Sequence, residues 1–435
     1  MSKKELMFTG SDTEGGITSG YQMNDGVKLK VPYSFFGSIY DEMEEKALLA
    51  VLKQDSQTMG PQVALFQNEF AREFTVKHAL ATSNCTTGMH AATQAMGIKA
   101  GDEVIVTPIT FIATSLVILK EGAKPVYADI DPKTFNIDPK DIENKITKKT
   151  KAIYVVHYGG QMCDMDPIME IARRHNLFVL EDCAHAHGAK YKGKQAGSIG
   201  DVGVFSFHSL KNMVTLGEGG MITTNNDQLI EKIQRMRVMS ITHWDPQQTD
   251  FEFAGIKLQK KDVKDYWIPS HFDVIDDEGK WGNNYRMCEA QAAVGRAQLM
   301  KLDMLIEKRR ANGHRLTEGI KGIEGITPTY EDPNCFHAFH LYTLCVEPEV
   351  LGASRDDFMR VLYQEEGIQG ILHYQPTYHL TGVKRTYNYP DKLCHNAEKF
   401  FYARQLNLPM NPRLTNNDVD MMIEGIRNAA KKVRK

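Results

Sequence analysis

Short apolar runs alternate with amphipathic stretches between residues 77 and 224. The runs predict strands at His78–Thr82, Glu103–Thr107, Pro125–Asp129, Ala152–His157, Phe178–Glu181, Gly203–Phe207 and Gly220–Thr224. Helical periodicity between them predicts helices at Thr86–Met96, Asp138–Ile146 and Asp164–His175. This alternation is typical of an α/β fold with a mostly parallel sheet and helices on both faces. Ligands in such folds bind at the carboxyl ends of the strands.

The alternation stops at residues 241–282, which are polar and contain all three tryptophans. A stretch of this length predicts a long excursion of the kind that is usually functional or mobile. Periodicity then returns, with helices expected at Cys288–Leu299, Met304–Lys321, Arg355–Glu366 and Asn416–Val433 and strands at Leu341–Val346 and Ile368–Leu372. We therefore expect an N-terminal arm (1–30), a large domain (31–287, including the excursion) and a smaller C-terminal α/β domain (288–435).

Composition narrows the class of protein. The chain has 52 lysines and arginines against 55 acidic residues, so its net charge of −3 lacks the basic excess that nucleic-acid binding requires. The longest apolar stretch, Phe111–Leu119, is far shorter than the roughly 20 residues of a membrane span. The N-terminus has no apolar signal segment, and the seven cysteines form no C-x-x-C pair. These features predict a cytoplasmic protein with reduced thiols, bound to neither nucleic acid nor membrane.

Three motifs imitate binding sites. Residues 188–195 nearly match a phosphate-binding loop, but Gln195 lacks the hydroxyl that holds magnesium. Cys183, His185 and His187 alternate like metal ligands, yet no fourth ligand accompanies them at zinc-like spacing, so we expect no metal. Residues 217–220 are glycine-rich but precede a strand, whereas a dinucleotide fingerprint opens a helix after one.

A lysine and an aspartate follow two of the predicted strands. Asp182 ends the apolar run 177–180, and Lys211 comes shortly after the run 204–207. If the two strands are neighbours, both side chains lie at one edge of the sheet. Pyridoxal phosphate needs this pair, because an amine bonds its aldehyde and a carboxylate keeps its ring nitrogen protonated. On these two residues alone, a structural ion pair is an equally good explanation.

Other residues favour the cofactor. The segment 82–88 leaves a strand and opens a helix, which places hydroxyls and free N–H groups where the helix dipole attracts a phosphate. Ser206 could add a hydroxyl to the same phosphate, and Phe111 follows a strand end, where it could lie on the pyridine ring. Together these residues account for the phosphate, ring face, ring nitrogen and aldehyde of one cofactor.

Several segments resemble the DegT/DnrJ/StrS family of sugar aminotransferases, from about residue 32 to the C-terminus. The similar segments are 101–108, 129–132, 181–188, 205–220, 281–287, 373–379 and 408–412. The resemblance implies a fold type I enzyme of the aspartate aminotransferase superfamily. It also implies pyridoxal phosphate as cofactor and a keto-sugar, usually nucleotide-linked, as substrate.

The resemblance also implies roles for individual residues. Lys211 would be the Schiff-base lysine, Asp182 would lie at the ring nitrogen and His185 near the ring hydroxyl. The phosphate would be held by Cys85, Thr86 and Ser206, with Phe111 stacked on the ring. Asn284 would reach the phosphate of the partner's cofactor, so that a homodimer shares its active sites. Substrate contacts are expected from His208, Tyr285, His373 and His379.

We therefore expect an aminotransferase that moves nitrogen from an amino acid, with glutamate the expected donor, to a keto-sugar for amino-sugar biosynthesis. Three alternatives remain. The substrate could be another ketone, such as a cyclitol or a keto-sugar acid, the reaction could be a dehydration, or the chain could be a non-catalytic binding member. Relatives that run a dehydration replace the lysine by histidine, whereas this chain retains Lys211. Cys85 departs from the glycine that family members usually have there.

Overall fold

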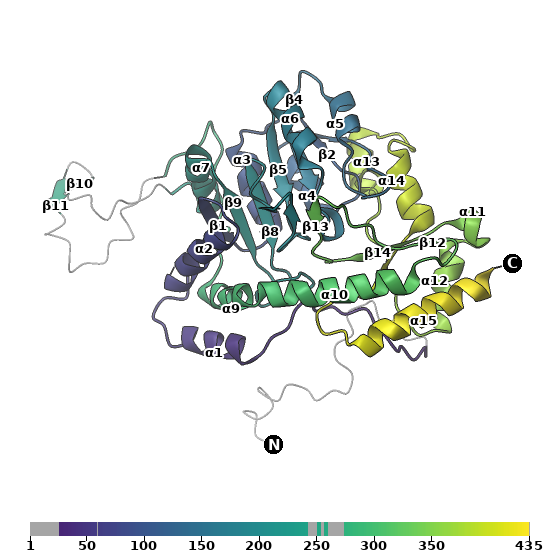
Figure 1. Cartoon of the computed structure of the whole chain (residues 1–435). Coiled ribbons are helices and arrows are strands. Elements are labelled where there is room, and N and C mark those ends of the chain that lie inside the picture. The colour runs from purple at the N-terminus through teal and green to yellow at the C-terminus, as the bar shows by residue number, and fades with distance from the viewer. Residues whose placement is uncertain (1–25, 59, 242–249, 254–255, 260–273, 435) are drawn as a thin grey trace.

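The large sheet has seven strands. The computed structural model describes residues 26–58, 60–241, 250–253, 256–259 and 274–434. The strands lie in the order β1-β9-β8-β5-β4-β2-β3 (Figure 1). Only β9 runs antiparallel to its neighbours, β1 and β8. Their bounds are His78–Thr82 (β1), Glu103–Val106 (β2), Lys124–Tyr127 (β3), Thr150–Val156 (β4), Phe178–Asp182 (β5), Val202–Ser206 (β8) and Gly220–Thr224 (β9).

Both faces of this sheet are covered, as near-continuous apolar strands require. In β4, Ala152 and Tyr154 join the core on one face, whereas Ile153 and Val155 join the core on the other. The first core includes helices α3 (Cys85–Ala95), α4 (Ala113–Lys120) and α7 (Asp227–Arg237). The second includes α2 (Pro61–Glu73), α5 (Pro139–Lys145) and α6 (Met165–His175). The α/β architecture predicted from the sequence is confirmed.

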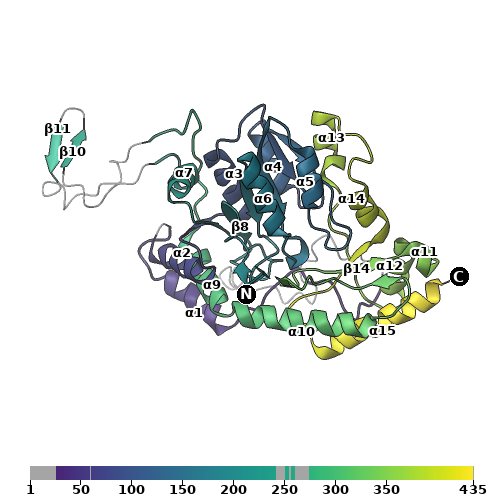
Figure 2. The same ribbon diagram turned by 45° about the horizontal axis from the view of Figure 1, so that its top comes forward.

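A second sheet of three strands lies in the C-terminal part of the chain. Its order is β12-β14-β15, with bounds Ile326–Thr327, Tyr342–Val346 and Gln405–Leu408. Its core takes residues from α10 (Leu302–Ile320), α12 (Arg355–Gln364) and α15 (Asn416–Val433). Helix α10 extends from α9 (Glu289–Met300) to α15, and α9 packs on α2 and α1 (Glu42–Val51) (Figure 2). One long helix therefore connects the two sheets.

The other elements are short. They are η1 (Tyr158–Gly160), β6 (Lys190–Tyr191), β7 (Lys194–Gln195), β10 (Asp250–Phe253), β11 (Ile256–Gln259), β13 (Cys335–Phe336), α11 (Pro348–Leu351), η2 (Thr377–His379), α13 (Thr381–Tyr387), α14 (His395–Lys399) and η3 (Phe400–Arg404). The predicted strand at Ile368–Leu372 is wrong. Ile368 forms an isolated parallel bridge with Val31, and Ile371 forms an isolated antiparallel bridge with Asn407 of β15. Strand β15 was not predicted from the sequence.

Most of the predicted excursion at residues 241–282 lies outside the described residues, as does the arm up to residue 25. Within it, β10 and β11 pair antiparallel. In the part of the chain that the structure describes, no helix is both long and apolar enough to span a bilayer.

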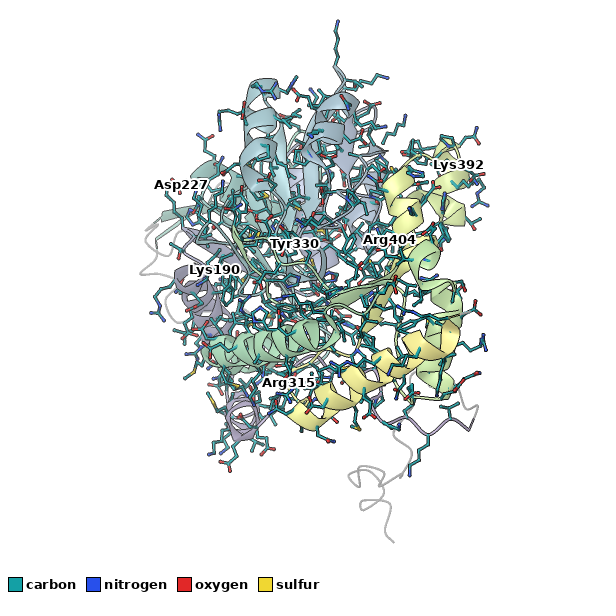
Figure 3. The ribbon with its side chains drawn as sticks, turned by 45° about the vertical axis from the view of Figure 1, so that its right-hand side comes forward. Lys190, Asp227, Arg315, Tyr330, Lys392 and Arg404 are labelled. Carbon is teal, nitrogen blue, oxygen red and sulfur yellow. The ribbon has the colours of Figure 1, made fainter. Side chains whose placement is uncertain are left out.

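Ion pairs join surface elements around the second sheet. Arg315 of α10 pairs with Asp420 of α15 at 2.7 Å, and Arg404 of η3 pairs with Glu347 (Figure 3). The ammonium nitrogen of Lys133 lies over the ring of Tyr330, 3.9 Å from the centre of that ring. Exposed pairs such as Arg315 with Asp420 typically contribute under about 1 kcal/mol each, so the cores carry most of the stability.

Candidate active site

Lys211, Asp182 and Ser206 lie at the carboxyl edge of the large sheet. Strands β5 and β8 are parallel neighbours, with Asp182 paired to Val204, so their ends point the same way. Asp182 and Ser206 are the last residues of these strands. Lys211 lies in the turn beyond β8, where its N–H donates to the carbonyl of His208 at 2.8 Å. The sheet therefore brings together the groups that the sequence placed at two strand ends.

The Asp182 carboxylate is buried and held by two donors. One oxygen accepts the hydroxyl of Thr114 at 2.8 Å, and the other accepts the N–H of Ala184 at 3.1 Å. Burial raises the pKa of Asp182, while these hydrogen bonds and the nearby Lys211 act in the opposite direction. A cation placed against this carboxylate would therefore stabilise its charged form.

Lys211 faces a cavity with walls from distant parts of the chain. Besides Lys211 it is lined by Tyr33, Gly37, His340, Tyr374 and Asn411, among others. Burial lowers the pKa of the Lys211 amine, and the carboxylate of Asp182 opposes that shift. The lysine is thus closer to its neutral, nucleophilic form than an exposed lysine would be.

Helix α3 begins at the same edge. Asn84 caps it by accepting the N–H of Thr87 at 2.9 Å, and the Thr87 hydroxyl lies 3.0 Å from that of Ser83. The N–H groups of Cys85 and Thr86 are in the first turn, where no intrahelical acceptor exists. The Cys85 thiol is buried and donates to the Val204 carbonyl at 3.8 Å. Its side chain therefore packs on β8, which leaves the backbone N–H as the group that an anion can reach.

His185 lies between several rings. Its Nδ1 accepts the N–H of Gly159 at 3.4 Å, which favours a proton on Nε2. Nε2 lies 3.4 Å from the hydroxyl of Tyr374, and the ring packs 4.2 Å from His340. Burial lowers the pKa of His185 well below its ordinary value, so the ring is a neutral donor. Phe111 meets Tyr374 edge-on at 6.2 Å and is 58% exposed, which leaves a face free for stacking.

The other residues expected at the substrate are more scattered. His373 lines the Lys211 cavity, and burial lowers its pKa to about 4. His208 is half-buried and its Nδ1 accepts the N–H of Leu210 at 3.3 Å. His379, in η2, instead hydrogen-bonds the hydroxyl of Tyr402 at 2.8 Å. It is not among the residues that line the cavity.

Asn284 and Tyr285 lie beside α3. Asn284 is exposed, bridges Val238 and accepts the Nε proton of Arg286 at 3.0 Å. The carbonyl of Tyr285 accepts the N–H of Ser83 at 2.8 Å, and its hydroxyl lies 2.8 Å from Nδ1 of His90. Tyr285 thus holds the start of α3 through these hydrogen bonds, while Asn284 stays at the surface.

Sequence reasoning missed several residues of this site. Thr114 lies one helical turn after Phe111 and could have been found by that spacing. Asn212 accepts from Nδ1 of His340 at 3.1 Å and donates to the Ala338 carbonyl at 3.2 Å, which fixes the histidine beside His185. Asn411 belongs to the family-like segment 408–412 and Tyr33 carries no local signal, and neither could be placed at this cavity because both reach it only through tertiary packing.

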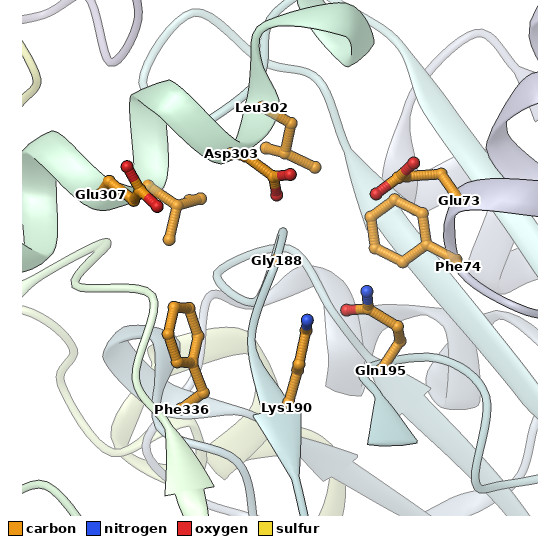
Figure 4. A pocket seen from close by; sticks show the side chains of 10 residues that line it. Glu73, Phe74, Gly188, Lys190, Gln195, Leu302, Asp303, Glu307 and Phe336 are labelled. Atoms are coloured by element: carbon orange, nitrogen blue, oxygen red, sulfur yellow. The ribbon is translucent and has the colours of Figure 1, made fainter. Parts of the chain in front are cut away.

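The segment that imitates a phosphate-binding loop has a structural role. The loop-like segment 188–195 forms the hairpin β6–β7, and no helix follows it. Gly188, Lys190 and Gln195 line a second cavity with Glu73 and Asp303 (Figure 4), and Lys211 is not among the residues that line it. This cavity contains none of the expected cofactor residues.

One cluster resembles a metal site: His157, Glu181 and Cys183 lie within 4.8 Å of one another. Nδ1 of His157 already accepts the N–H of Cys163 at 3.1 Å, so Nε2 carries the proton and donates to Glu181 at 2.9 Å. Glu181 also accepts backbone N–H groups from Gly197, Ile199 and Gly200. These atoms are occupied within the protein, so the cluster serves the fold.

Pyridoxal phosphate fits the main site. Free N–H groups at α3 suit its phosphate, and the exposed face of Phe111 suits its ring. A protonated ring nitrogen would supply the cation that the buried Asp182 carboxylate lacks. The amine of Lys211, its pKa lowered by burial, suits the aldehyde.

Comparisons with known proteins identify similar sequences and structures. The sequence profile of the DegT/DnrJ/EryC1/StrS aminotransferase family matches residues 38–427. GDP-perosamine synthase of Caulobacter vibrioides is 38% identical over 370 residues, which span 85% of this chain and 90% of that protein. The spore coat polysaccharide biosynthesis protein SpsC of Bacillus subtilis is 36% identical over 401 residues, spanning 92% and 97%. The crystal structure of an aminotransferase from Psychrobacter cryohalolentis superposes with a TM-score of 0.83 at 32% identity, covering 93% and 100%.

Proposed function

We propose, because this chain belongs to the DegT/DnrJ/EryC1/StrS aminotransferase family, that it transfers an amino group from L-glutamate to a nucleotide-linked keto-sugar. Membership of this family establishes the general reaction: the protein is a pyridoxal-phosphate-dependent sugar aminotransferase. The identity to GDP-perosamine synthase supports a nucleotide-linked acceptor. The product would be an amino sugar for polysaccharide, lipopolysaccharide or antibiotic synthesis.

Pyridoxal phosphate, when bound, supplies an aldehyde that bonds an amine and a ring that accepts electrons. We assign the amine to Lys211 and the partner of the ring nitrogen to Asp182. Where the substrate amine takes the place of Lys211 on the cofactor, the free Lys211 amine would serve as the base that holds the proton taken from the substrate carbon and would later give it back. Such a positioned base typically contributes roughly 10²–10⁴-fold in rate.

We assign phosphate binding to Thr86, Ser206 and the backbone N–H of Cys85. His185 would donate from Nε2 to the ring hydroxyl, and Phe111 would cover one ring face. The exposed position of Asn284 supports a role across a homodimer interface, where it would reach the partner's phosphate. The observation that carries the proposal is the convergence of Lys211, Asp182 and the start of α3 at one sheet edge.

The test uses the purified cofactor-loaded enzyme. Addition of L-glutamate without acceptor should convert the visible absorption of the bound cofactor to that of its aminated form. GDP- and UDP-linked keto-sugars should then restore the original spectrum, whereas the free keto-sugars should not. A spectrum unchanged by glutamate would exclude this donor, and restoration by free sugars alone would exclude the nucleotide linkage.

A further inference from the structure

The last residues of the excursion are fixed to the chain that precedes it. The N–H of Ile275 donates to the carbonyl of Ser240 at 3.0 Å, and the N–H of Gly282 donates to the hydroxyl of the same serine at 2.7 Å. Residues 274–282 therefore lie against the chain just beyond α7. They lead directly into Asn284 and Tyr285, beside the start of α3.

Lys280 extends from this segment into a cluster with Glu121 and His90. Its ammonium nitrogen lies 2.8 Å from one carboxylate oxygen of Glu121, just after α4, and the other oxygen lies 2.9 Å from Nε2 of His90 on α3. None of the three side chains is more than 15% exposed. Burial acts to raise the pKa of Glu121, but the hydrogen bonds from His90 and Lys280 outweigh burial and lower that pKa. The carboxylate is therefore charged.

This charged carboxylate fixes the direction of the hydrogen bonds around it. Because Glu121 offers only lone pairs, Nε2 of His90 carries a proton and donates to it. Lys280 already balances the charge of Glu121, so the histidine ring can stay neutral. Nδ1 of a neutral ring is then an acceptor, and the hydroxyl of Tyr285 donates to it at 2.8 Å. The tyrosine side chain is thereby tied to the cluster.

Tyr285 and Lys280 hold α3 at three levels. Before the helix, the carbonyl of Tyr285 accepts the N–H of Ser83 at 2.8 Å. Within the helix, the tyrosine hydroxyl binds His90. Beyond its end, the ammonium group of Lys280 donates to the carbonyl of Ile98. A change in this cluster would therefore move the first turn of α3, where the free backbone N–H groups lie.

We propose that Lys280, Glu121 and His90 are positioning residues for the cofactor phosphate, on which they act through Tyr285 and the start of α3. This inference rests on the proposed function, which assigns the phosphate to that helix start. None of the three would touch the phosphate. The end of the excursion, residues 274–282, is then part of the support of the cofactor site.

The test compares pyridoxal phosphate with pyridoxal, which lacks the phosphate group. Titration of the full-length enzyme freed of cofactor, followed by visible absorption, would give the dissociation constant of each. In Glu121→Gln one acceptor oxygen is lost, so we expect roughly three- to tenfold weaker binding of pyridoxal phosphate. The affinity for pyridoxal should stay the same, because Lys211 and Asp182 are unchanged. A purely structural role of the cluster would weaken both ligands alike.

Tyr285→Phe removes only the hydroxyl and keeps the ring and the backbone carbonyl. It leaves Lys280 and Glu121 paired, so it tests the same path without an unpaired buried charge. We expect the same selective loss of affinity for pyridoxal phosphate. The double variant of Tyr285 and Glu121 should lose less than the product of the two single effects, because both act along one chain of hydrogen bonds.

Glu44→Gln is the matched control. Glu44 of α1 is also a buried carboxylate, 4% exposed, and it pairs with Lys301 at the end of α9 at 2.8 Å. Its variant also leaves a buried lysine without its carboxylate, but both affinities should equal those of the wild type. The positioning role is overturned if Glu121→Gln binds pyridoxal phosphate within twofold of this control, or if it loses pyridoxal affinity to the same extent.

Thr86→Val separates this inference from the proposed function. Loss of the Thr86 hydroxyl should weaken pyridoxal phosphate binding and leave pyridoxal binding unchanged. Selective weakening in Thr86→Val with none in Glu121→Gln would overturn the positioning role alone. Selective weakening in Glu121→Gln with none in Thr86→Val would overturn the assigned hydroxyl contact and retain the positioning role. Neither titration uses glutamate or a keto-sugar, so a failure to aminate nucleotide-linked sugars leaves both results standing.

Discussion

Lys211 is the residue on which the proposed chemistry depends. Its alanine variant has no amine to bond the cofactor aldehyde, so we expect loss of the visible absorption and at least a hundredfold loss of turnover. Absorption spectroscopy and an assay with glutamate and the acceptor would measure both. Because Lys211 lies in a turn, circular dichroism and the melting temperature should change little.

Lys190→Ala is the control for that experiment. Lys190 lines the other cavity (Figure 4), so its variant should keep both colour and activity. Retained turnover in Lys211→Ala would show that another amine performs the reaction.

Buried histidines make the stability of the protein depend on pH. Burial lowers the pKa of His187 and of His337 to about 3, and Nδ1 of His337 accepts the N–H of Phe339 at 2.8 Å. Below pH 6.5 the unfolded chain binds protons at these rings and the folded chain does not. The free energy of unfolding should therefore fall by about 1.4 kcal/mol per pH unit for each ring as the pH drops from about 6.5 towards about 3.

Urea titrations at pH 7, 6 and 5 would measure this effect. In His187→Leu the free energy of unfolding should depend less steeply on pH, by the contribution of one ring, about 1.4 kcal/mol per pH unit. Parallel curves for the variant and the wild type would show that His187 does not stay neutral in the folded protein.

At the scale of elements, helix α2 depends on a cap from a distant residue. Its N-cap, Gly60, has no side chain to bind the first N–H groups. The buried carboxylate of Glu289, on α9, accepts the N–H groups of Gly60 at 2.8 Å, Gln62 at 2.7 Å and Val63 at 3.1 Å. A negative charge at this position also complements the helix dipole.

Glu289→Gln should destabilise the protein by about 1.5–3 kcal/mol, because an amide has one acceptor oxygen where the carboxylate has two. Urea unfolding at a fixed protein concentration would measure this difference. Glu73→Gln, at the exposed far end of the same helix, should change stability by less than about 0.5 kcal/mol. Equal effects of the two variants would rule out capping by Glu289.

At the scale of the whole molecule, shared active sites predict complementation. Lys211→Ala lacks the lysine, and Asn284→Glu would repel the partner's phosphate. In a mixed dimer, the site with an intact lysine receives Asn284 from the lysine-deficient chain and is fully wild type. Random mixing of equal amounts should then restore about a quarter of native activity, half of the dimers being mixed with one working site each.

Subunit exchange must be verified separately, for example with differently tagged chains. If exchange occurs and no activity returns, or if the active species sediments as a monomer, Asn284 does not act across an interface.

The sequence by itself determined the large sheet and the central pair of residues. Strands β1 and β9 match their predicted bounds, and the other strands of that sheet differ by one or two residues at one or both ends. Apolar periodicity is a local property, so it survives in any fold that buries those runs. Parallel strands also place their carboxyl ends at one edge, which is why Asp182 and Lys211 could be paired before the structure was known.

Only the tertiary structure decided which surfaces meet. The cap of α2 joins residues more than 200 positions apart, and Arg309 and Arg413 hydrogen-bond the loop at Ser34–Gly37 from at least 272 positions further along the chain. The third strand of the second sheet is β15, which was not predicted, whereas Ile368–Leu372 forms only isolated bridges. Periodicity states which face of an element is buried but not what covers it. That choice depends on the packing of the whole chain, where side-chain volumes and buried polar groups must be satisfied together.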